Sequence, residues 1–320
     1  MKKKNILFLK GINDDRRVIV FSITNNNHYN IGIDGSSNIY EFLNSERFSK
    51  HELCFDTNQD QKLFLKDVDV VFNQIADSDS HTIALSKAAF LEKQINGKIP
   101  FFNKAENIRK TARDEVYRLL DGEEGLTVPK TIKIVPDTPD KVYEEIRKAG
   151  MVLPVILRKA GDHGGISTIL IENDKEQFHA FPLDGRAYYL TQFIEQDKYQ
   201  GLYRKIRLVI VNGEVFLRHI MFSEEWMVHN KNQKEDVKEI AHFSKRFNKE
   251  VKPKITDVIT RIHKIIGLDY FGIDCDINEN GNITIYELNA TMNVLYSRDS
   301  SIFKKHVERI RDALITMLVG

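Results

Sequence analysis

Several features that would assign a protein to a class are scarce in this sequence. It has 2 cysteines in 320 residues, Cys54 and Cys275, which argues against a disulfide framework and against a cysteine zinc site. Lys and Arg total 47 while Asp and Glu total 46, so no net charge favours nucleic acid or an anionic membrane surface. No apolar run approaches the roughly 20 residues that span a bilayer, and the run over residues 6–9 is too short for a signal-peptide core. We therefore expect a soluble, cytoplasmic protein that binds neither nucleic acid nor membrane.

The most informative segment is residues 270–289, where two apolar runs flank a turn signal. Residues two apart in a strand share a face, so Asp274 is expected to point away from the core, and Glu287 and Asn289 to share a face. Asn280-Gly281 between the runs indicates a hairpin, because both residues tolerate the positive φ of a type I′ turn. Mg²⁺ prefers such oxygen ligands and is usually held by one or two carboxylates plus substrate phosphates. A hairpin that carries a magnesium site is therefore predicted.

Two alternatives exist for the same residues. Asp276 to Glu287 also satisfies the calcium-loop pattern of an EF-hand. An EF-hand loop lies between helices, whereas the flanking segments here alternate with a period of two and are rich in β-branched and aromatic residues. The other alternative is an ordinary hairpin with a polar outer face, and only evidence from elsewhere in the chain separates it from a metal site.

The pattern of strands and helices indicates α/β and α+β organisation. Over residues 5–100, short apolar strands expected over 5–9, 18–22 and 68–72 alternate with an amphipathic helix expected over 80–94, which predicts strands paired in parallel. Helical spacing continues over 103–120, and a new domain is expected to start near residue 104. Strand and helix signals then predict a small α+β lobe and a larger C-terminal lobe. The predicted domains are residues 1–103, 104–188 and 189–320.

A glycine-rich segment follows the apolar strand that ends in Arg158. Glycines let a backbone approach phosphate closely and present its N–H groups, and a cation at the strand end neutralises phosphate oxygens. The Gly-x₄-Gly-Lys-Ser/Thr order of a Walker loop is absent. A Gly-rich turn between strands is the alternative. The candidate phosphate-binding residues are Arg158, Gly161, Gly164 and Gly165.

Cations also recur along two strands predicted over 203–222, which are joined by a second hairpin signal at Asn212-Gly213. Lys205, Arg207 and Arg218 belong to this set. Such a pattern fits the stabilisation of phosphate and of a developing oxyanion. A ladder of cross-strand charges on a solvated face is the alternative.

Taken together, these features resemble the ATP-grasp superfamily over roughly residues 104–293. Asp274, Glu287 and Asn289 look like its metal-binding Asp, Glu and Asn, and the spacing 287 − 274 = 13 is typical of D-alanine:D-alanine ligases. Glutathione synthetase and the ribosomal-protein glutamate ligases are similar. The resemblance implies two Mg²⁺ ions, with Glu287 bridging them, Asp274 holding one and Asn289 the other, and with Mn²⁺ able to replace Mg²⁺.

The chain departs from the family pattern at two places near this site. Members usually continue with a small residue, Pro and Gly after the Asn, whereas Ala290-Thr291-Met292 follows here. They also usually carry an Arg two residues before the metal-binding Asp, where this chain has Gly272. Arg207 resembles the Arg of an Asp-Ile-Arg motif, with Lys205 at the place of its Asp. Either Arg207 or Arg218 is expected to take the catalytic role of the missing Arg.

The resemblance also assigns a nucleotide site. The strand over 189–195 resembles the segment between lobes that receives adenine, and Arg113 stands where members carry another phosphate-binding basic residue, with Arg109 and Lys110 as alternatives. His163 in the glycine-rich loop would act catalytically by covering the γ-phosphate or an acyl-phosphate. The residues expected at adenine and ribose are Gln192, Phe193, Ile194 and Glu195.

The implied fold is an ATP-grasp fold, in which an N-terminal α/β domain precedes two α+β lobes that enclose the nucleotide. The implied activity is an ADP-forming carboxylate-amine ligase: ATP phosphorylates a carboxylate, and an amine attacks the acyl-phosphate to give an amide or peptide bond. The substrates would be small molecules or peptides, Trp226 and His229 would line the acceptor pocket, and a homodimer is left open. The alternatives are an ATP-grasp phosphotransferase and a nucleotide-binding protein without turnover.

Overall fold

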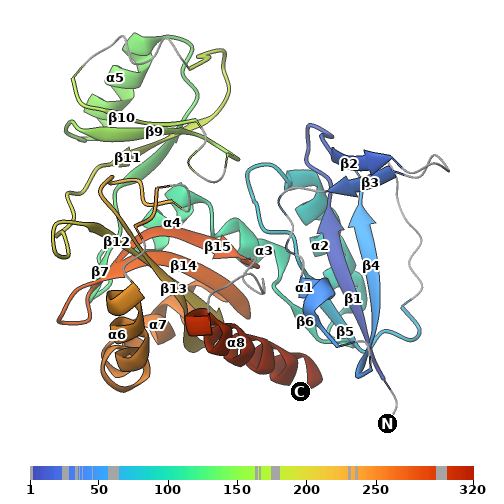
Figure 1. Cartoon of the computed structure of the whole chain (residues 1–320). Helices are drawn as coiled ribbons and strands as arrows, with labels where there is room; N and C mark the ends of the chain where they lie inside the picture. Colours follow the sequence, from blue (N-terminus) through green and yellow to red (C-terminus); the bar gives the residue numbers. More distant parts are fainter. Residues whose placement is uncertain are drawn as a thin grey trace.

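The computed structural model describes residues 3–23, 29–32, 35, 37, 39–44, 46–56, 65–162, 165, 167–173, 181–229, 232–234, 237–292 and 301–320. Within these residues the strands form three sheets of four or five strands and a separate two-stranded hairpin. Each large sheet belongs to its own lobe, and the lobes follow one another along the chain except for the short strand β7 (Leu126–Thr127), which precedes the central sheet but joins the C-terminal one (Figure 1). The mixed α/β and α+β class expected from the sequence is confirmed.

The N-terminal lobe is a parallel sheet in the order β4 (Phe48–Phe55), β1 (Lys4–Gly11), β5 (Val70–Asn73) and β6 (Phe101–Phe102). Helix α2 (Thr82–Ile95) buries one apolar stripe against it, as its 3.6-residue spacing requires; a short helix, α1, spans Ile39–Phe42. One expectation was wrong: residues 18–22 do not join the parallel sheet. They lie in β2 (Ile19–Ile23), which pairs antiparallel with β3 (Tyr29–Gly32).

The helix expected over 103–120 is two helices, α3 (Ala105–Arg109) and α4 (Arg113–Leu120). The N–H and the hydroxyl of Thr111 both bond to the carbonyl of Ile108, at 3.0 and 2.7 Å. Ala112 then takes an extended conformation with ψ of 140°. Because Ser and Thr side chains compete for backbone groups, the first helix ends here, and Arg113 opens the second.

The central lobe is an antiparallel sheet in the order β10 (Thr168–Ile171), β9 (Val155–Lys159), β11 (Tyr188–Gln192) and β8 (Thr131–Ile134). Helix α5 (Pro139–Lys148) covers one face. It starts with Thr138 as N-cap and Pro139 in the first turn, as helix starts favour. Since β11 pairs with both β8 and β9, the expected boundary between residues 188 and 189 passes through a strand of this sheet.

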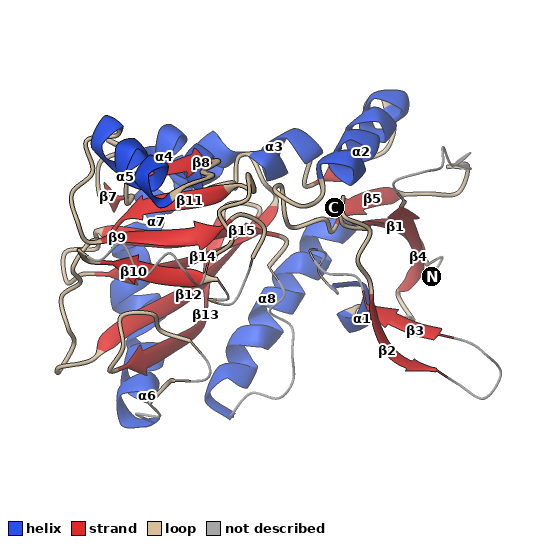
Figure 2. Cartoon of the chain, turned by 90° about the horizontal axis from the view of Figure 1, so that it is seen from above, coloured by secondary structure: helices blue, strands red, loops and turns tan. Residues whose placement is uncertain are grey.

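The C-terminal lobe has the sheet β13 (Glu214–Ser223), β12 (Tyr203–Val211), β14 (Tyr270–Ile277), β15 (Ile283–Ala290) and β7 (Leu126–Thr127). Helix α7 (Lys252–Ile266) covers one face through an isoleucine-rich stripe, and α6 (Val237–Arg246) continues into it through a π-helix, η2 (Phe247–Val251). On the other face, α8 (Ser301–Val319) runs from this sheet toward the N-terminal lobe (Figure 2). None of the described helices combines the length and apolarity needed to cross a membrane.

The two predicted hairpin turns have different outcomes. Asn212 and Gly213 have φ of 47° and 82°, so the type I′ turn is confirmed there. In the loop between β14 and β15, the described positive φ belongs to Gly281 (90°) and not to Asn280. Instead, the side-chain oxygen of Asn278 accepts from the N–H groups of Asn280 and Asn282, at 3.0 and 2.9 Å. The hairpin exists, but the type I′ turn predicted for it was wrong, because an Asn side chain organises a longer loop.

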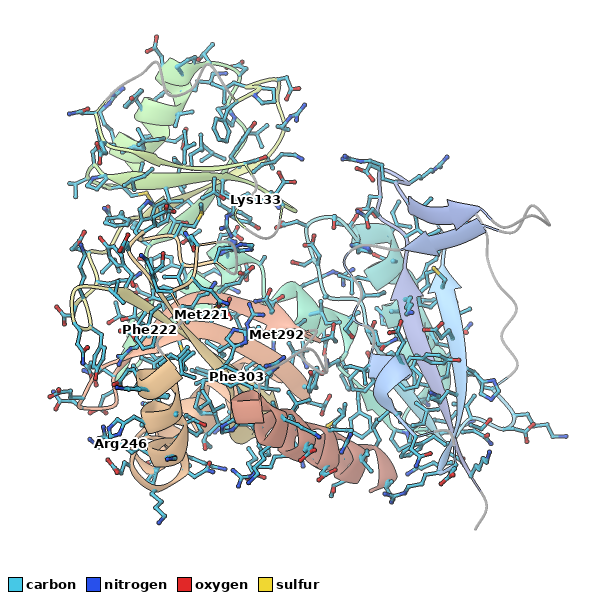
Figure 3. The ribbon with its side chains drawn as sticks, in the orientation of Figure 1. Lys133, Met221, Phe222, Arg246, Met292 and Phe303 are labelled. Atoms are coloured by element: carbon cyan, nitrogen blue, oxygen red, sulfur yellow. The ribbon has the colours of Figure 1, made fainter. Side chains whose placement is uncertain are left out.

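The lobes meet through buried polar contacts. From the N-terminal lobe, Asp79 accepts the hydroxyl of Tyr189 at 2.8 and 2.7 Å and pairs with Lys133 at 2.6 Å. Lys133 lies on the edge of the central lobe that faces the other two (Figure 3). The hydroxyl of Thr291, just after β15, donates to the carbonyl of Gln74 at 3.0 Å. These contacts therefore join the N-terminal lobe to the central lobe and, beside the end of β15, to the C-terminal lobe.

Candidate active site

A row of charged side chains crosses the C-terminal sheet. In register, Arg207 of β12 lies opposite Asp274 of β14, and Asp274 lies opposite Glu287 of β15. Directly opposed residues have Cβ atoms about 5 Å apart. Phe271, Ile273, Cys275 and Ile277 are buried beneath the sheet, as alternation predicts. We call Arg207, Asp274 and Glu287 the charged row.

Asp274 is the most enclosed member of the row, with 3% of its surface exposed. Arg207 holds it with two parallel bonds, Nε to Oδ1 at 2.6 Å and Nη2 to Oδ2 at 2.7 Å. The Nζ of Lys205 lies 3.7 Å from Oδ2. Although burial opposes protonation, the charge and hydrogen bonds of Asp274 raise the pKa of Arg207. Burial lowers the pKa of Lys205, against the pull of Asp274.

Glu287 is held by Arg113, whose Nη2 lies 2.6 Å from its Oε1. The Nη1 of Arg113 also donates to the carbonyl of Tyr286 at 3.2 Å. The two alternatives to Arg113 point elsewhere: Arg109 donates to Ser86, and Lys110 to carbonyls at the end of α7. Because the chain breaks between α3 and α4, Arg113 is the first residue of α4, and from there its side chain contacts Glu287 of the charged row.

The donor set predicted for a metal consists of two carboxylates, Asp274 and Glu287, and the amide of Asn289. Asn289 lies two residues beyond Glu287 on β15. It is opposite Gly272, which lies two residues before Asp274 on β14. Among the described residues, no group of three or more His, Cys, Asp or Glu side chains could hold a metal ion. Two carboxylates and a carbonyl oxygen suit a hard cation that takes its remaining ligands from phosphate and water.

The EF-hand alternative does not fit this segment. Strands β14 and β15 flank the loop, and an EF-hand needs helices there. Asp276 pairs with Arg204 at 2.6 Å, and the side-chain oxygen of Asn278 bonds to backbone N–H groups of its own loop.

A cleft opens between the central sheet and the charged row. Its empty volume is about 920 Å³, part of which opens to solvent. One end is charged and the other is mostly apolar. The apolar end is formed by residues of β9, of the segment after β11 and of the loop after β13. The charged end is lined by Arg113, Arg158, Lys205, Asp274 and Glu287, and the other end by Ile156, Phe193, Ile194, Trp226, Met227 and Val228.

Arg158 is a half-buried cation that forms no ion pair with any described residue. Its Nε donates to the neutral hydroxyl of Thr168 at 2.9 Å. Burial, and next the positive charge of Arg113, lower the pKa of Arg158 to about 10. A guanidinium in this setting is stabilised by an anion.

Of the predicted loop glycines, Gly165 lies beside Met227 of the cleft wall, and Gly161 lies beside the N-terminal lobe. Gly161 has φ of 78°, and its position for a Cβ is 3.6 Å from Ser80 of the N-terminal lobe. Gly165 has φ of 77°, and a Cβ there would lie 3.0 Å from the sulfur of Met227. The loop therefore packs closely at both ends. His163 and Gly164 fall outside the described residues.

The segment expected to receive adenine lies at the apolar end of the cleft. Gln192, Phe193 and Ile194 line it, and neither the N–H nor the carbonyl of Ile194 has a hydrogen-bond partner among the described residues. Glu195, expected at ribose, is not a lining residue. It accepts from the hydroxyl of Tyr203 at 3.2 Å, and Gln196 lines the cleft instead.

Trp226 packs against Phe193 edge to face, with ring centroids 5.7 Å apart. It therefore lines the cleft beside the segment expected to receive adenine, and its role at an acceptor pocket stays a prediction. His229 is not among the residues that line the cleft.

Arg218 is buried, 5% exposed, and does not line the cleft. The place of the missing family Arg is filled instead: a Cβ on Gly272 would lie 2.4 Å from Met292, which is labelled near the centre of Figure 3. Of the two arginines considered for the catalytic role, Arg207 belongs to the charged row and pairs with Asp274.

Comparison with protein families agrees with this geometry. A family model for the RimK-like ATP-grasp domain matches residues 112–306, more than half of the chain. The chain belongs to the RimK-like ATP-grasp family. A comparison with functionally curated proteins finds no match.

Solved ATP-grasp structures share the fold at low sequence identity. A D-alanine–D-alanine ligase from Bacillus anthracis complexed with ATP is 12% identical, with 99% of this chain and 95% of that chain covered and a TM-score of 0.54. A RimK domain protein from Sphaerobacter thermophilus is 12% identical, with 99% and 100% covered and a TM-score of 0.55. The ATP-grasp ligase PsnB, complexed with a minimal precursor, Mg and ADP, is 15% identical, with 98% of both chains covered and a TM-score of 0.53.

Tyr286 is a residue of this ATP-grasp cleft that sequence reasoning missed. Strict alternation places it on the core side, but Cys275 pairs with Ile285 while Asp274 pairs with Glu287, so Tyr286 is the extra residue of a β-bulge. It lines the cleft, and its hydroxyl is buried without a hydrogen-bond partner among the described residues. Bulges commonly re-aim side chains at sites, and no local sequence signal marks this one.

Proposed function

We propose that this ATP-grasp protein is an ADP-forming ligase that joins a carboxylate to an amine through an acyl-phosphate. The observation that carries the proposal is the charge at one end of the cleft. Four cations, Arg113, Arg158, Lys205 and Arg207, lie there with two carboxylates, Asp274 and Glu287. Arg113, Lys205 and Arg207 are paired with these carboxylates, and a polyphosphate would supply the anion that Arg158 lacks among the described residues.

The donor set fits a divalent cation beside that polyphosphate. Asp274, Glu287 and Asn289 would hold Mg²⁺, one ion or two, and Mn²⁺ has compatible chemistry. When bound, Mg²⁺ neutralises phosphate charge and orients the transferred group. Arg207 and Arg113 hold the two carboxylates in place. One fold relative was solved with ATP and another with Mg and ADP. These two structures support the binding of an adenine nucleotide and Mg²⁺ here.

The remaining cleft residues fit the other parts of ATP. The apolar end around Ile156, Phe193 and Met227 provides a slot for a flat base, and the backbone of Ile194 offers a donor and an acceptor at its edge. Arg158 and Lys205 face the phosphates. Arg207, held in a fixed orientation by Asp274, is placed to stabilise the oxyanion that forms when an amine attacks.

A phosphotransferase is the second candidate, because the same charges would serve transfer to a hydroxyl. The ligase is favoured because the fold relatives named above include two ligases and because the charged row is complete. A protein that only binds nucleotide would not need Asp274 and Glu287 to be held by arginines beside the phosphates. The presence of both pairs therefore favours an enzyme.

The test is phosphate release from Mg-ATP in the presence of pooled amino acids and small peptides, with mass spectrometry of each positive pool. A product equal to two components minus water supports the ligase. A phosphorylated component without condensation supports the phosphotransferase, and nucleotide binding without phosphate release in any pool supports the third alternative.

Substitution of Arg158 by Ala is expected to weaken ATP binding by about 10-fold to 100-fold, since it removes one charge-assisted contact. Calorimetry with ATP and no second substrate measures this directly. Arg147→Ala on the exposed side of α5 is the matched control in the same lobe. Equal affinities for the two variants would assign Arg158 to the packing of the central sheet alone.

A further inference from the structure

Three polar side chains lie next to one another on the face of the central sheet that looks into the cleft. In register, Arg158 of β9 lies opposite Tyr189 of β11, and Tyr189 lies opposite Lys133 of β8. Arg158 lines the cleft, whereas Tyr188 and Leu190 are buried in the core of the lobe on the other face. Because successive strand residues point to opposite faces, Tyr189 and Lys133 share the face of Arg158.

The N-terminal lobe contacts this face through Asp79. The hydroxyl of Tyr189 donates to both carboxylate oxygens of Asp79, at 2.8 and 2.7 Å, and the Nζ of Lys133 lies 2.6 Å from Oδ1 of Asp79. The same Nζ lies 5.6 Å from the centre of the Tyr189 ring. Burial, followed by the charge of Asp79, raises the pKa of Tyr189, so the hydroxyl stays a donor. We call Asp79, Tyr189 and Lys133 the clasp.

The loop that carries Asp79 is ordered by contacts of its own. The N–H of Asp79 donates to Oδ1 of Asp77 at 2.8 Å, and the hydroxyl of Ser80 donates to the other oxygen of Asp77. Such a turn fixes the backbone locally. Gly161 packs on the same loop, since a Cβ there would lie 3.6 Å from Ser80 and 3.8 Å from Asp77. Asp79 is therefore presented to the central lobe in a defined orientation.

The hydrophobic cores divide the protein into two bodies. Both large clusters of buried residues contain side chains of the N-terminal and the C-terminal lobe, and Phe72 meets Tyr270 with ring centroids 6.2 Å apart. The side chain of Asn103, after β6, also donates to Tyr270 at 2.7 Å and accepts from Asp269 at 2.9 Å. The core of the central lobe contains no described residue of the other two lobes. The central lobe is therefore a separate body above the C-terminal sheet (Figure 1).

The central lobe is connected to the other body at one end of its sheet. The chain enters β8 after residue 130 and leaves β11 at residue 193, and Thr131 lies opposite Thr191. Arg158, Tyr189 and Lys133 lie toward the other end of the same strands. Rotation about the two connections, as in a hinge, thus moves Arg158 relative to the charged row and separates the clasp.

We propose that Asp79 is a positioning residue that holds the nucleotide cleft closed through the clasp. The proposal rests on the proposed function only for nucleotide binding, which the ligase and the phosphotransferase share. With the clasp formed, Arg158 is held over the charged row. With the clasp broken, the central lobe rotates away and the nucleotide enters or leaves. Because the apparent Kd is the intrinsic Kd divided by the closed fraction, the N-terminal lobe strengthens ATP binding without lining the cleft.

The first test measures the closed fraction without nucleotide. Spin labels are placed on α2 and α5 through Gln94→Cys and Arg147→Cys, both at exposed positions. Cys54 is replaced by Ser, and Cys275 is buried. Distances between the labels are then recorded for the full chain, alone and with Mg²⁺ and a non-hydrolysable ATP analogue.

Two neighbouring tyrosines provide the test variant and its matched control. Tyr189→Phe removes the bond to the N-terminal lobe, whereas Tyr188→Phe removes a bond of 2.8 Å to the carbonyl of Pro182 inside the central lobe. We expect one short distance for the wild-type protein and Tyr188→Phe. Tyr189→Phe should add a longer distance that the analogue abolishes. An unchanged distribution in Tyr189→Phe, or the same change in both variants, would overturn the proposal.

The second test follows release of a fluorescent ATP analogue by stopped flow. Tyr189→Phe is expected to release it about 10-fold faster than the wild-type protein, as loss of one hydrogen bond to a charged group implies. Tyr188→Phe should release it at the wild-type rate. Asp79→Asn, which keeps an acceptor for Tyr189 but loses the charge that pairs with Lys133, should also release it faster. Equal rates in all variants would contradict a role of the clasp in closure.

The two tests separate this proposal from the proposed function. If the wild-type protein binds no nucleotide, the proposed function fails, and the label distances without nucleotide still decide whether the clasp holds the cleft closed. If nucleotide binds but no pool yields an amide, the ligase fails, and both tests of the clasp remain decisive.

Discussion

Glu287→Gln is expected to lower turnover about 1,000-fold or more while the protein stays folded. The substitution removes one negative charge from the proposed metal site and keeps the shape of the side chain. Loss of one preorganised electrostatic contact at a reacting phosphate typically costs 100-fold to 1,000-fold, and Glu287 would also contact the metal. Folding should change little, because its side chain is 23% exposed and the amide oxygen still accepts from Arg113.

A matched control exists on the neighbouring helix. Glu115 also pairs with an arginine, Arg118, at 2.6 Å, but it lies outside the cleft. Phosphate release and the midpoint of urea unfolding are measured for Glu287→Gln and Glu115→Gln in parallel. The account fails if both variants keep full activity, or if Glu287→Gln loses activity only because it unfolds.

Arg207→Ala is expected to have the largest effect on stability, with loss of activity as a second consequence. Asp274 has a side chain only 4% exposed, and Arg207 provides both of its closest contacts. Removing one partner of a buried pair costs about 3 kcal/mol, and because the Arg207 side chain is 25% exposed we expect about 2 kcal/mol. Urea unfolding measures the change.

Two further measurements separate this effect from ordinary loss of packing. Asp274→Asn in the Arg207→Ala background should recover part of the stability, since the uncompensated charge is then gone. Mg²⁺ should stabilise Arg207→Ala more than the wild-type protein, because the cation replaces the lost guanidinium beside Asp274. If Mg²⁺ has the same effect on both proteins, Asp274 is not a metal ligand.

Sequence reasoning predicted the site best where it followed from the strand period. Alternation placed Asp274 on the face away from the core and put Glu287 and Asn289 on a shared face, and the β-bulge at Tyr286 turns that second pair to the side of Asp274, with Asp274 opposite Glu287. Arg158 and Gln192 line the cleft for the same reason: each lies near the end of a short strand with a clear apolar pattern. Their roles stay predictions.

What the sequence did not reveal depends on irregular backbone and on contacts between lobes. Two β-bulges, at Tyr286 and Arg218, shift the faces of all following residues, and a bulge has no local composition signal. The place of Trp226 against Phe193 joins residues from different lobes. The split at Thr111 depends on a side chain that bonds to its own helix.

The central claim is that a carboxylate is activated by ATP and then captured by an amine in this cleft. The most direct measurement uses a heavy-oxygen-labelled carboxylate from a positive pool and follows the label by mass spectrometry. The account predicts an amide product, ADP, and one labelled oxygen in the released phosphate. Labelled oxygen retained in a phosphorylated product, with no amide formed, would contradict it.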